Sequence, residues 1–174
     1  MPFPTDFLTE RLQAERLRPE HVTEIHRMQA DPEQMALLGG ARTEAETSVY
    51  MEKNLRHWEE HGFGTWLLRE RASGSVVGRA VLRHLLLEDI DEIEVGYGFH
   101  QAWWGRGLAQ EITRACLGYA RDPIGARSVV ALTHPFNTRS HRVLERTGFR
   151  LEREIEQEGV RHCLFRTHSL WAAD

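Results

Sequence analysis

Lysine and cysteine are scarce in this sequence. Lys53 is the only lysine among 22 basic residues, and a formal net charge of −4 leaves no general positive field for binding nucleic acid. The two cysteines, Cys116 and Cys163, fall in an expected helix and an expected strand. They are therefore predicted to be small core residues rather than a disulfide or a metal-binding pair. No metal site is expected.

Long apolar runs are also absent. None approaches the length of a membrane span, and the first residues, MPFPTDFLTERL, carry acids where a signal peptide has a basic and then an apolar region. We therefore expect a cytoplasmic protein with no membrane partner. Because 174 residues suit one compact domain and no linker or repeat divides them, residues 1–174 are expected to form a single domain.

Hydrophobic periodicity and turn signals predict an α/β chain. Strands are expected at 11–18, 64–71, 75–84, 90–99, 127–133, 149–156 and 160–170, and helices at 19–29, 44–61, 105–121 and 138–147. Thr43 and Glu46 are spaced as a capping box at the start of the second helix, and Gly148 follows the fourth.

A glycine-rich segment opens the third expected helix. Gly105 and Gly107 follow two tryptophans and precede apolar residues at helical spacing. The first four N–H groups of a helix lack intrahelical partners and favour negative charge, so this segment predicts a phosphate or pyrophosphate site. The dinucleotide pattern GxGxxG/A is excluded by Gln110, and the GxxxxGK[ST] loop is absent.

The same segment resembles the acyl-CoA loop of the GNAT acetyltransferases, [QR]-x-x-G-x-[GA], with Gly107 and Ala109 in the last two places and Trp104 in the first. The form Trp-Gly-x-Gly-x-Ala is similar to the branch that includes the ribosomal-protein N-terminal acetyltransferases. Further segments in the order of that branch are Thr9-Glu10-Arg11-Leu12, Leu17-Arg18-Pro19, His61-Gly62-Phe63-Gly64-Thr65-Trp66, Glu94-Val95-Gly96-Tyr97, residues 134–140 and residues 143–149.

The resemblance implies a GNAT fold with acetyl-CoA as co-substrate. That fold is a mixed, twisted sheet of about six to seven strands, splayed between the fourth and fifth strands and flanked by about four helices. The residues implied to bind the cofactor are Tyr97, Gly98, Phe99, Trp104, Gly105, Arg106, Gly107, Leu108, Ala109, Asn137 and Ser140. Arg106, Arg139, Arg142 and Arg146 are expected near the same loop.

Alternation in strand 90–99 places Glu92 and Glu94 on one face, leading toward the cofactor loop. Acyl transfer to an amine needs a proton acceptor, so a carboxylate is the expected base. Glu94 is the first choice because it matches the acidic position of the family's Glu-x-Gly-Tyr motif. Glu92 and Asp91 are the reserves. The competing interpretation is that these acids only solvate an exposed strand face.

Many GNAT enzymes carry a tyrosine four residues before a Gly-Phe pair, where it protonates the leaving thiolate. This chain has Leu144 at that place. Ser140 matches the serine of the family's Asn-x-x-Ser motif and is the candidate to hydrogen-bond the thiol. Asn137 is also a preferred N-cap residue for the helix that it opens.

The expected acceptor is a primary amine, preferably a peptide or protein α-amino group, with small amines and aminoglycosides as the alternative. It is expected to enter beside Met35, Leu38, Trp58, Trp66, His84 and His134. A non-catalytic acyl-CoA-binding module is a further alternative, and the chain is expected to be a monomer or a homodimer.

The zinc-peptidase pattern HxxEH is also matched, by His57-Trp58-Glu59-Glu60-His61. We interpret this as a chance match on a helix ended by Gly62.

Overall fold

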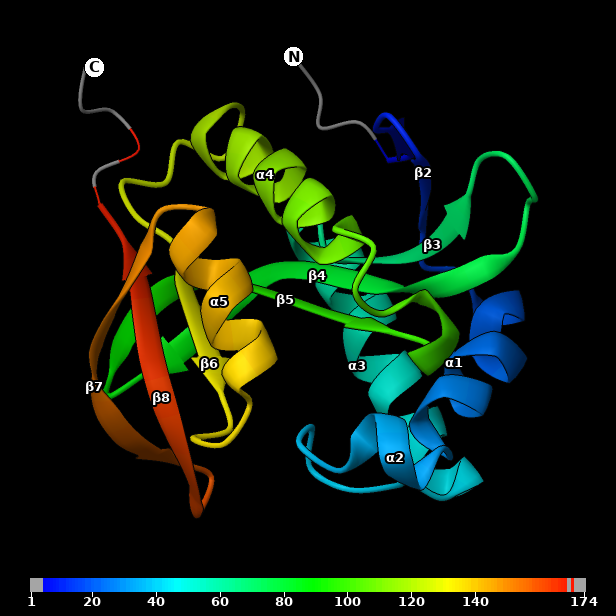
Figure 1. The fold of residues 1–174 in the computed structure, drawn as a ribbon, viewed down its shortest axis with the longest axis horizontal. Coiled ribbons are helices and arrows are strands. Elements are labelled where there is room, and N and C mark those ends of the chain that lie inside the picture. Colours follow the sequence, from blue (N-terminus) through cyan, green and yellow to red (C-terminus); the bar gives the residue numbers. More distant parts are fainter. Residues whose placement is uncertain (1–4, 169, 171–174) are drawn as a thin grey trace.

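The structure is a computed structural model that describes residues 5–168 and 170. Within that part, eight strands form one sheet in the order β1-β2-β3-β4-β5-β6-β8-β7 (Figure 1). The strands are β1 (Phe7–Leu8), β2 (Leu12–Arg16), β3 (Thr65–Glu70), β4 (Val76–Leu87), β5 (Ile90–Phe99), β6 (Val130–Thr133), β7 (Phe149–Gln157) and β8 (Val160–Thr167). This is the mixed sheet expected from the sequence, with one strand more than expected.

The parallel pair β5–β6 is the feature that positions the site. All other neighbouring strands run antiparallel, whereas β5 and β6 are parallel and share one register pair, Glu94 with Val130. Beyond that pair, the C-terminal ends of the two strands diverge. The expected splay is thus present, and it falls between the fifth and sixth strands because the two-residue β1 adds a strand at the N-terminal edge.

Helices cover both faces of the sheet. They are α1 (Val22–Gln29), α2 (Pro32–Met35), α3 (Glu44–His61), α4 (Leu108–Arg121) and α5 (Thr138–Arg146), with short 3-10 turns η1 (Pro19–His21) and η2 (Gln101–Trp103). In Figure 1, α4 and α5 lie on the near face, and α3 passes behind β4 and β5. No helix within the described residues combines the length and apolar character needed to cross a membrane.

Two buried clusters join these layers. The larger one contains the buried stripe of α4 at helical spacing, Leu108, Ile112 and Cys116, packed with residues of β2 to β5. A smaller cluster forms around Leu87, Val130, Ile155 and Leu164 at the β6–β8 side of the sheet. Cys116 and Cys163 are both buried and free, which confirms their prediction as core residues.

Several expected boundaries need correction. The helix expected at 105–121 begins at Leu108. Gly105 and Gly107 have left-handed φ values of 74° and 78°, which are incompatible with a right-handed helix, so both residues belong to the preceding loop. Pro19 opens a 3-10 turn, and the α-helix starts only at Val22. The short α2 and β1 were not expected. The capping box of α3 is confirmed: Thr43 Oγ1 accepts from the Glu46 N–H, and Glu46 accepts from the Thr43 N–H.

Candidate functional site

A cavity of about 550 Å³ lies where β5 and β6 diverge. Its walls come from the end of β5, the loop into α4, the first turn of α4 and the start of α5. The structure brings together at this cavity all the residues that the resemblance implied for the cofactor: Tyr97, Gly98, Phe99, Trp104, Gly105, Arg106, Gly107, Leu108, Ala109, Asn137 and Ser140.

The first turn of α4 opens directly into the cavity. The earliest backbone bond of this helix is donated by the Glu111 N–H to the Gly107 carbonyl at 3.2 Å, so the N–H groups of residues 108–110 have no acceptor within the helix. Gly105 and Gly107 have a left-handed backbone, and residues 108–110, which carry these donors, all line the cavity. A helix N-terminus of this kind is an arrangement that suits an anion.

The N-terminal segment braces this loop, which sequence reasoning missed. The Glu111 carboxylate of α4 accepts from the Thr9 hydroxyl at 2.6 Å and from the Arg11 N–H and Nε, each at 2.7 Å. Arg11 also donates to the Arg106 carbonyl at 2.7 Å. Burial acts to raise the pKa of Glu111, but the donors from Thr9 and Arg11 outweigh it and the pKa is lowered. The Thr9-Glu10-Arg11-Leu12 segment thus holds the loop in place.

Arginines and tryptophans form the cationic side of the cavity. The Arg139 guanidinium lies 4.0 Å from the ring centroid of Trp104, and that of Arg106 lies 4.6 Å from the ring of Trp103. The indole N–H of Trp104 donates to the Phe99 carbonyl at 2.9 Å, which fixes the loop against the end of β5. Arg142 and Arg146 line the cavity as well. The expected gathering of arginines near the loop is therefore present.

Ser140 and Tyr97 meet at the inner end of α5. Asn137 caps this helix, because its Oδ1 accepts from the Ser140 N–H at 3.2 Å, so the expected N-cap role is present. Burial raises the pKa of Tyr97 to about 12, and the neighbouring Ser140 side chain offsets part of that effect. The Tyr97 hydroxyl makes no direct hydrogen bond of 3.5 Å or less to a described residue. Leu144, at the place of the family's tyrosine, is buried in the core.

Glu94 is buried and is ion-paired across the sheet. It lies opposite Arg83 of β4, whose Nε donates to Glu94 Oε2 at 2.6 Å. Burial acts to lower the pKa of Arg83, but Glu94 outweighs it and that pKa is raised. The second oxygen, Oε1, makes no hydrogen bond to a residue that the structure describes. Glu94 does not line the cavity itself; it shares the strand face of Gly98, which does.

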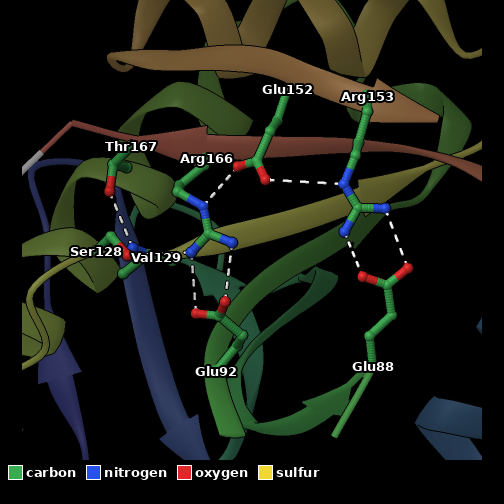
Figure 2. Close-up of polar contacts among 8 residues, drawn as sticks. All are labelled: Glu88, Glu92, Ser128, Val129, Glu152, Arg153, Arg166 and Thr167. Carbon is green, nitrogen blue, oxygen red and sulfur yellow. Dashed lines mark hydrogen bonds and ion pairs between the residues drawn. The ribbon is translucent and has the colours of Figure 1, made fainter. Parts of the chain in front are cut away.

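Glu92 has a structural partner of its own. Figure 2 shows Arg166 of β8 donating to both carboxylate oxygens of Glu92, at 3.0 and 2.8 Å, and also to Glu152 at 2.6 Å. This bidentate pair links β5 to β8 across β6. Asp91, the other reserve, is exposed and lies 2.9 Å from His84 Nδ1. Neither acid lines the cavity.

Of the residues expected around the acceptor, Leu38 lines the cavity. Met35, Trp58 and Trp66 are buried in the core instead. The Trp58 indole N–H donates to the Thr65 carbonyl, and its ring packs edge-on against Trp66. His134 lies outside the lining and accepts from the Phe136 N–H.

The HxxEH segment lies at the end of α3, where His57 Nδ1 contacts the Phe63 carbonyl and His57 Nε2 accepts from the His84 N–H. Both ring nitrogens of His57 are thus occupied. Within the described ranges, no group of three or more His, Cys, Asp or Glu is arranged to hold a metal ion.

The fold is that of the acyl-CoA-dependent GNAT transferases, and the sequence comparison gives the family. The model of the acetyltransferase (GNAT) domain family matches residues 11–150, so the chain belongs to this family. It is a GNAT-type acetyltransferase and uses acetyl-CoA as the acetyl donor.

Its similar proteins include an uncharacterized protein, a named transacetylase and solved acetyltransferase structures. The uncharacterized protein YkkB of Bacillus subtilis is 29% identical over 73% of this chain and 74% of its own length. The FsC-acetyl coenzyme A-N(2)-transacetylase of Aspergillus fumigatus is 28% identical over 80% of this chain, which spans 63% of that protein. A solved GNAT-family structure from Bordetella pertussis has a TM-score of 0.81 at 25% identity, covering 94% of this chain and 99% of that one.

Proposed function

We propose that this protein transfers the acetyl group of acetyl-CoA directly to a primary amine, preferably the α-amino group of a peptide or protein. The observation that carries the proposal is the first turn of α4, whose unpaired N–H donors open into a cavity at the divergence of β5 and β6. A pyrophosphate needs this combination of donors, and a thioester needs the adjacent gap in the sheet.

In this proposal, each part of the cofactor has its own contacts. The unpaired N–H groups of residues 108–110 hold the pyrophosphate, the loop from Trp104 surrounds it, and Arg106 and Arg139 neutralise its charge. The pantetheine pairs with the backbone of residues 97–99, since this end of β5 has no partner in β6. The thioester then reaches Ser140 and Tyr97.

The amine nitrogen attacks the thioester carbon, a C–N bond forms and the C–S bond breaks. The amine proton passes to Glu94 through water, since Glu94 does not line the cavity itself. The accepting atom is Oε1, because Arg83 is bonded to the other carboxylate oxygen. The Ser140 hydroxyl donates to the leaving thiolate. No covalent enzyme intermediate is proposed, since Cys116 and Cys163 are both buried.

The preference for an α-amino group follows from protonation energetics. At pH 7.5 the neutral form of a lysine-like amine with a pKa of about 10.4 costs roughly 4 kcal/mol, whereas an α-amino group costs under about 1. A single buried carboxylate already held by Arg83 suits the easier task.

The fold is shared with a ribosomal-protein-S5-alanine acetyltransferase from Vibrio fischeri and with AAC(6')-Ib, at TM-scores of 0.77 and 0.75.

Free-CoA release with three acceptor panels tests the proposal. The first panel holds peptides with free N-termini, the second the same peptides blocked at the N-terminus but carrying an internal lysine, and the third polyamines and aminoglycosides. We expect the highest kcat/KM in the first panel. Faster turnover in either of the others contradicts the α-amino preference, and no release from any amine contradicts acetyl transfer.

Glu94→Gln and Glu92→Gln separate the proposed base from the structural acid. Glu94→Gln should retain acetyl-CoA affinity and lose about 10²- to 10⁴-fold in kcat/KM, the usual effect of removing a general base. Glu92→Gln weakens the pair with Arg166 and should therefore lower the unfolding temperature. It should leave kcat within roughly three-fold of the wild-type value, since Glu92 takes no proton from the amine. A larger kinetic loss in Glu92→Gln moves the role of base to that residue.

A further inference from the structure

Three arginines gather around one tyrosine on the α3 side of the sheet. Arg42, just before α3, has its guanidinium 5.2 Å from the ring centroid of Tyr50, and Arg79 of β4 lies 5.6 Å from the same ring. Arg83 lies four residues beyond Arg79 on the same strand face. Each of the three arginine side chains is partly buried. The result is a concentrated positive charge beside the gap between β5 and β6.

Two of these three cations have no anionic partner. Arg83 is paired with Glu94, but the guanidinium groups of Arg42 and Arg79 make no ion pair or hydrogen bond to any residue within 5–168 or 170. Burial, followed by the charge of Arg79, lowers the pKa of Arg42. The charge of Glu46 acts to raise the pKa of Arg42, but the Glu46 carboxylate is hydrogen-bonded to the Thr43 N–H at the start of α3 and makes no ion pair with Arg42. Partly burying unpaired cations is unfavourable unless an anion joins them.

The cluster lies next to the cavity, behind the wall formed by Gly98 and Leu38. A Cβ placed on Gly98 would lie 3.7 Å from Leu38 Cδ1 and 4.0 Å from Arg79 Nε. Gly98 and Leu38 both line the cavity, so Arg79 lies immediately behind that wall. The cofactor loop leads into α4, on the near face of the sheet in Figure 1, whereas Arg42 and Arg79 contact Tyr50 of α3, which passes behind β4 and β5.

We propose that Arg42 and Arg79 bind an anionic group, a carboxylate or a phosphate, that the acceptor carries close to its reacting amine. This inference rests on the proposed function and names the substrate class of the same site. The planar guanidinium presents paired donors that match both anions. The same charges disfavour a protonated amine, which helps to keep the nucleophile neutral, and they oppose acceptors with several positive charges.

The first test compares acceptors that differ only in the charge of one side chain. Four peptides with the same free N-terminus carry aspartate, asparagine, O-phosphoserine or lysine at the second position, and free-CoA release measures kcat and KM. We expect kcat/KM for the better anionic peptide to exceed that for the asparagine peptide by about 10- to 100-fold, mainly through KM, the size of one charge-assisted hydrogen bond. The aspartate and O-phosphoserine arms tell a carboxylate site from a phosphate site.

The second test removes the charge from the cluster. Arg79→Gln and Arg42→Gln should lower kcat/KM for the preferred anionic peptide by about 10-fold or more and change the asparagine peptide by less than about 3-fold. Arg56→Gln is the matched control, because Arg56 lies on α3 but is exposed and paired with Glu52. It should change neither peptide. Thermal unfolding with and without acetyl-CoA reports whether each variant is folded.

The outcomes separate this inference from the proposed function. If asparagine or lysine peptides are acetylated as well as the anionic ones, the anion site is wrong while acetyl transfer remains. If the anionic peptide is preferred but folded Arg79→Gln and Arg42→Gln keep that preference, the assignment to these arginines is wrong. If no peptide or other amine releases CoA, the proposed function itself fails.

Discussion

Replacing Gly107 with valine should weaken acetyl-CoA binding without unfolding the protein. Gly107 has a φ of 78° at the N-cap of α4, a conformation that a β-branched residue adopts only with strain of about 1–3 kcal/mol. Relief of that strain rotates the peptide groups on either side, and the donors of the first helical turn move with them. The added side chain also meets Arg11, whose Nη2 lies 3.5 Å from a Cβ built at this position.

The magnitude follows from the donors that are lost. A hydrogen bond to a charged group contributes about 1.5–3 kcal/mol, so misplacing one N–H toward the pyrophosphate weakens binding about 10- to 150-fold. Strain alone should lower the unfolding temperature by about 2–12 °C in a chain of this length. Calorimetric titration with acetyl-CoA and thermal unfolding measure the two effects separately.

Gly74→Val is the matched control. Gly74 has a φ of 72° in the turn between β3 and β4, and a Cβ there meets no atom within 4 Å. This variant should show similar destabilisation with unchanged affinity. Equal affinities of the two folded variants would refute the assignment of the α4 loop as the pyrophosphate site.

Three further predictions concern stability, reactivity and charge. Glu111→Gln should destabilise the fold by about 1–3 kcal/mol at pH 7. Because the pKa of Glu111 is lowered in the folded state, its contribution to stability is fully present above the ordinary glutamate pKa of about 4.3 and is lost as the pH falls through the lowered value. The free energies of unfolding of the wild-type and Glu111→Gln proteins, measured in urea, should therefore converge in acid. Burial raises the pKa of the Cys116 thiol to about 12, so iodoacetamide at pH 8 should label Cys116 and Cys163 only after unfolding; labelling of the native protein with loss of turnover would contradict direct transfer. Arg139→Ala should weaken acetyl-CoA binding about 10-fold and reduce its salt dependence, whereas Arg114→Ala, an exposed change on α4, should leave both unaltered.

Elements with strong local signals could be predicted closely. The helix expected at 44–61 matches α3, because the capping box of Thr43 and Glu46 and the left-handed Gly62 are read from neighbouring residues. The strand expected at 90–99 matches β5, since its alternation is continuous. The four-residue α2 and the two-residue β1 were missed because so few residues carry no periodicity.

Partners far apart in sequence could not be predicted. Glu94 and Glu92 look equivalent in the alternating strand, yet β4 supplies Arg83 to the first and β8 supplies Arg166 to the second. The choice depends on the order of the strands in the sheet, in which β8 lies next to β6, ahead of β7, so that Arg166 reaches Glu92 across β6. The Thr9 and Arg11 contacts to Glu111 join residues about a hundred positions apart for the same reason.

The sequence by itself determined the family and the loop that opens α4, because glycine conformation, helix periodicity and motif order are local properties, and the family resemblance named part of the cavity lining. Only the tertiary structure decided which carboxylate has a free oxygen and which arginines lack a partner. Those properties depend on the distances between side chains of different strands and helices. In the folded chain, Arg42 and Arg79 meet at Tyr50, and no stretch of sequence brings these three residues together.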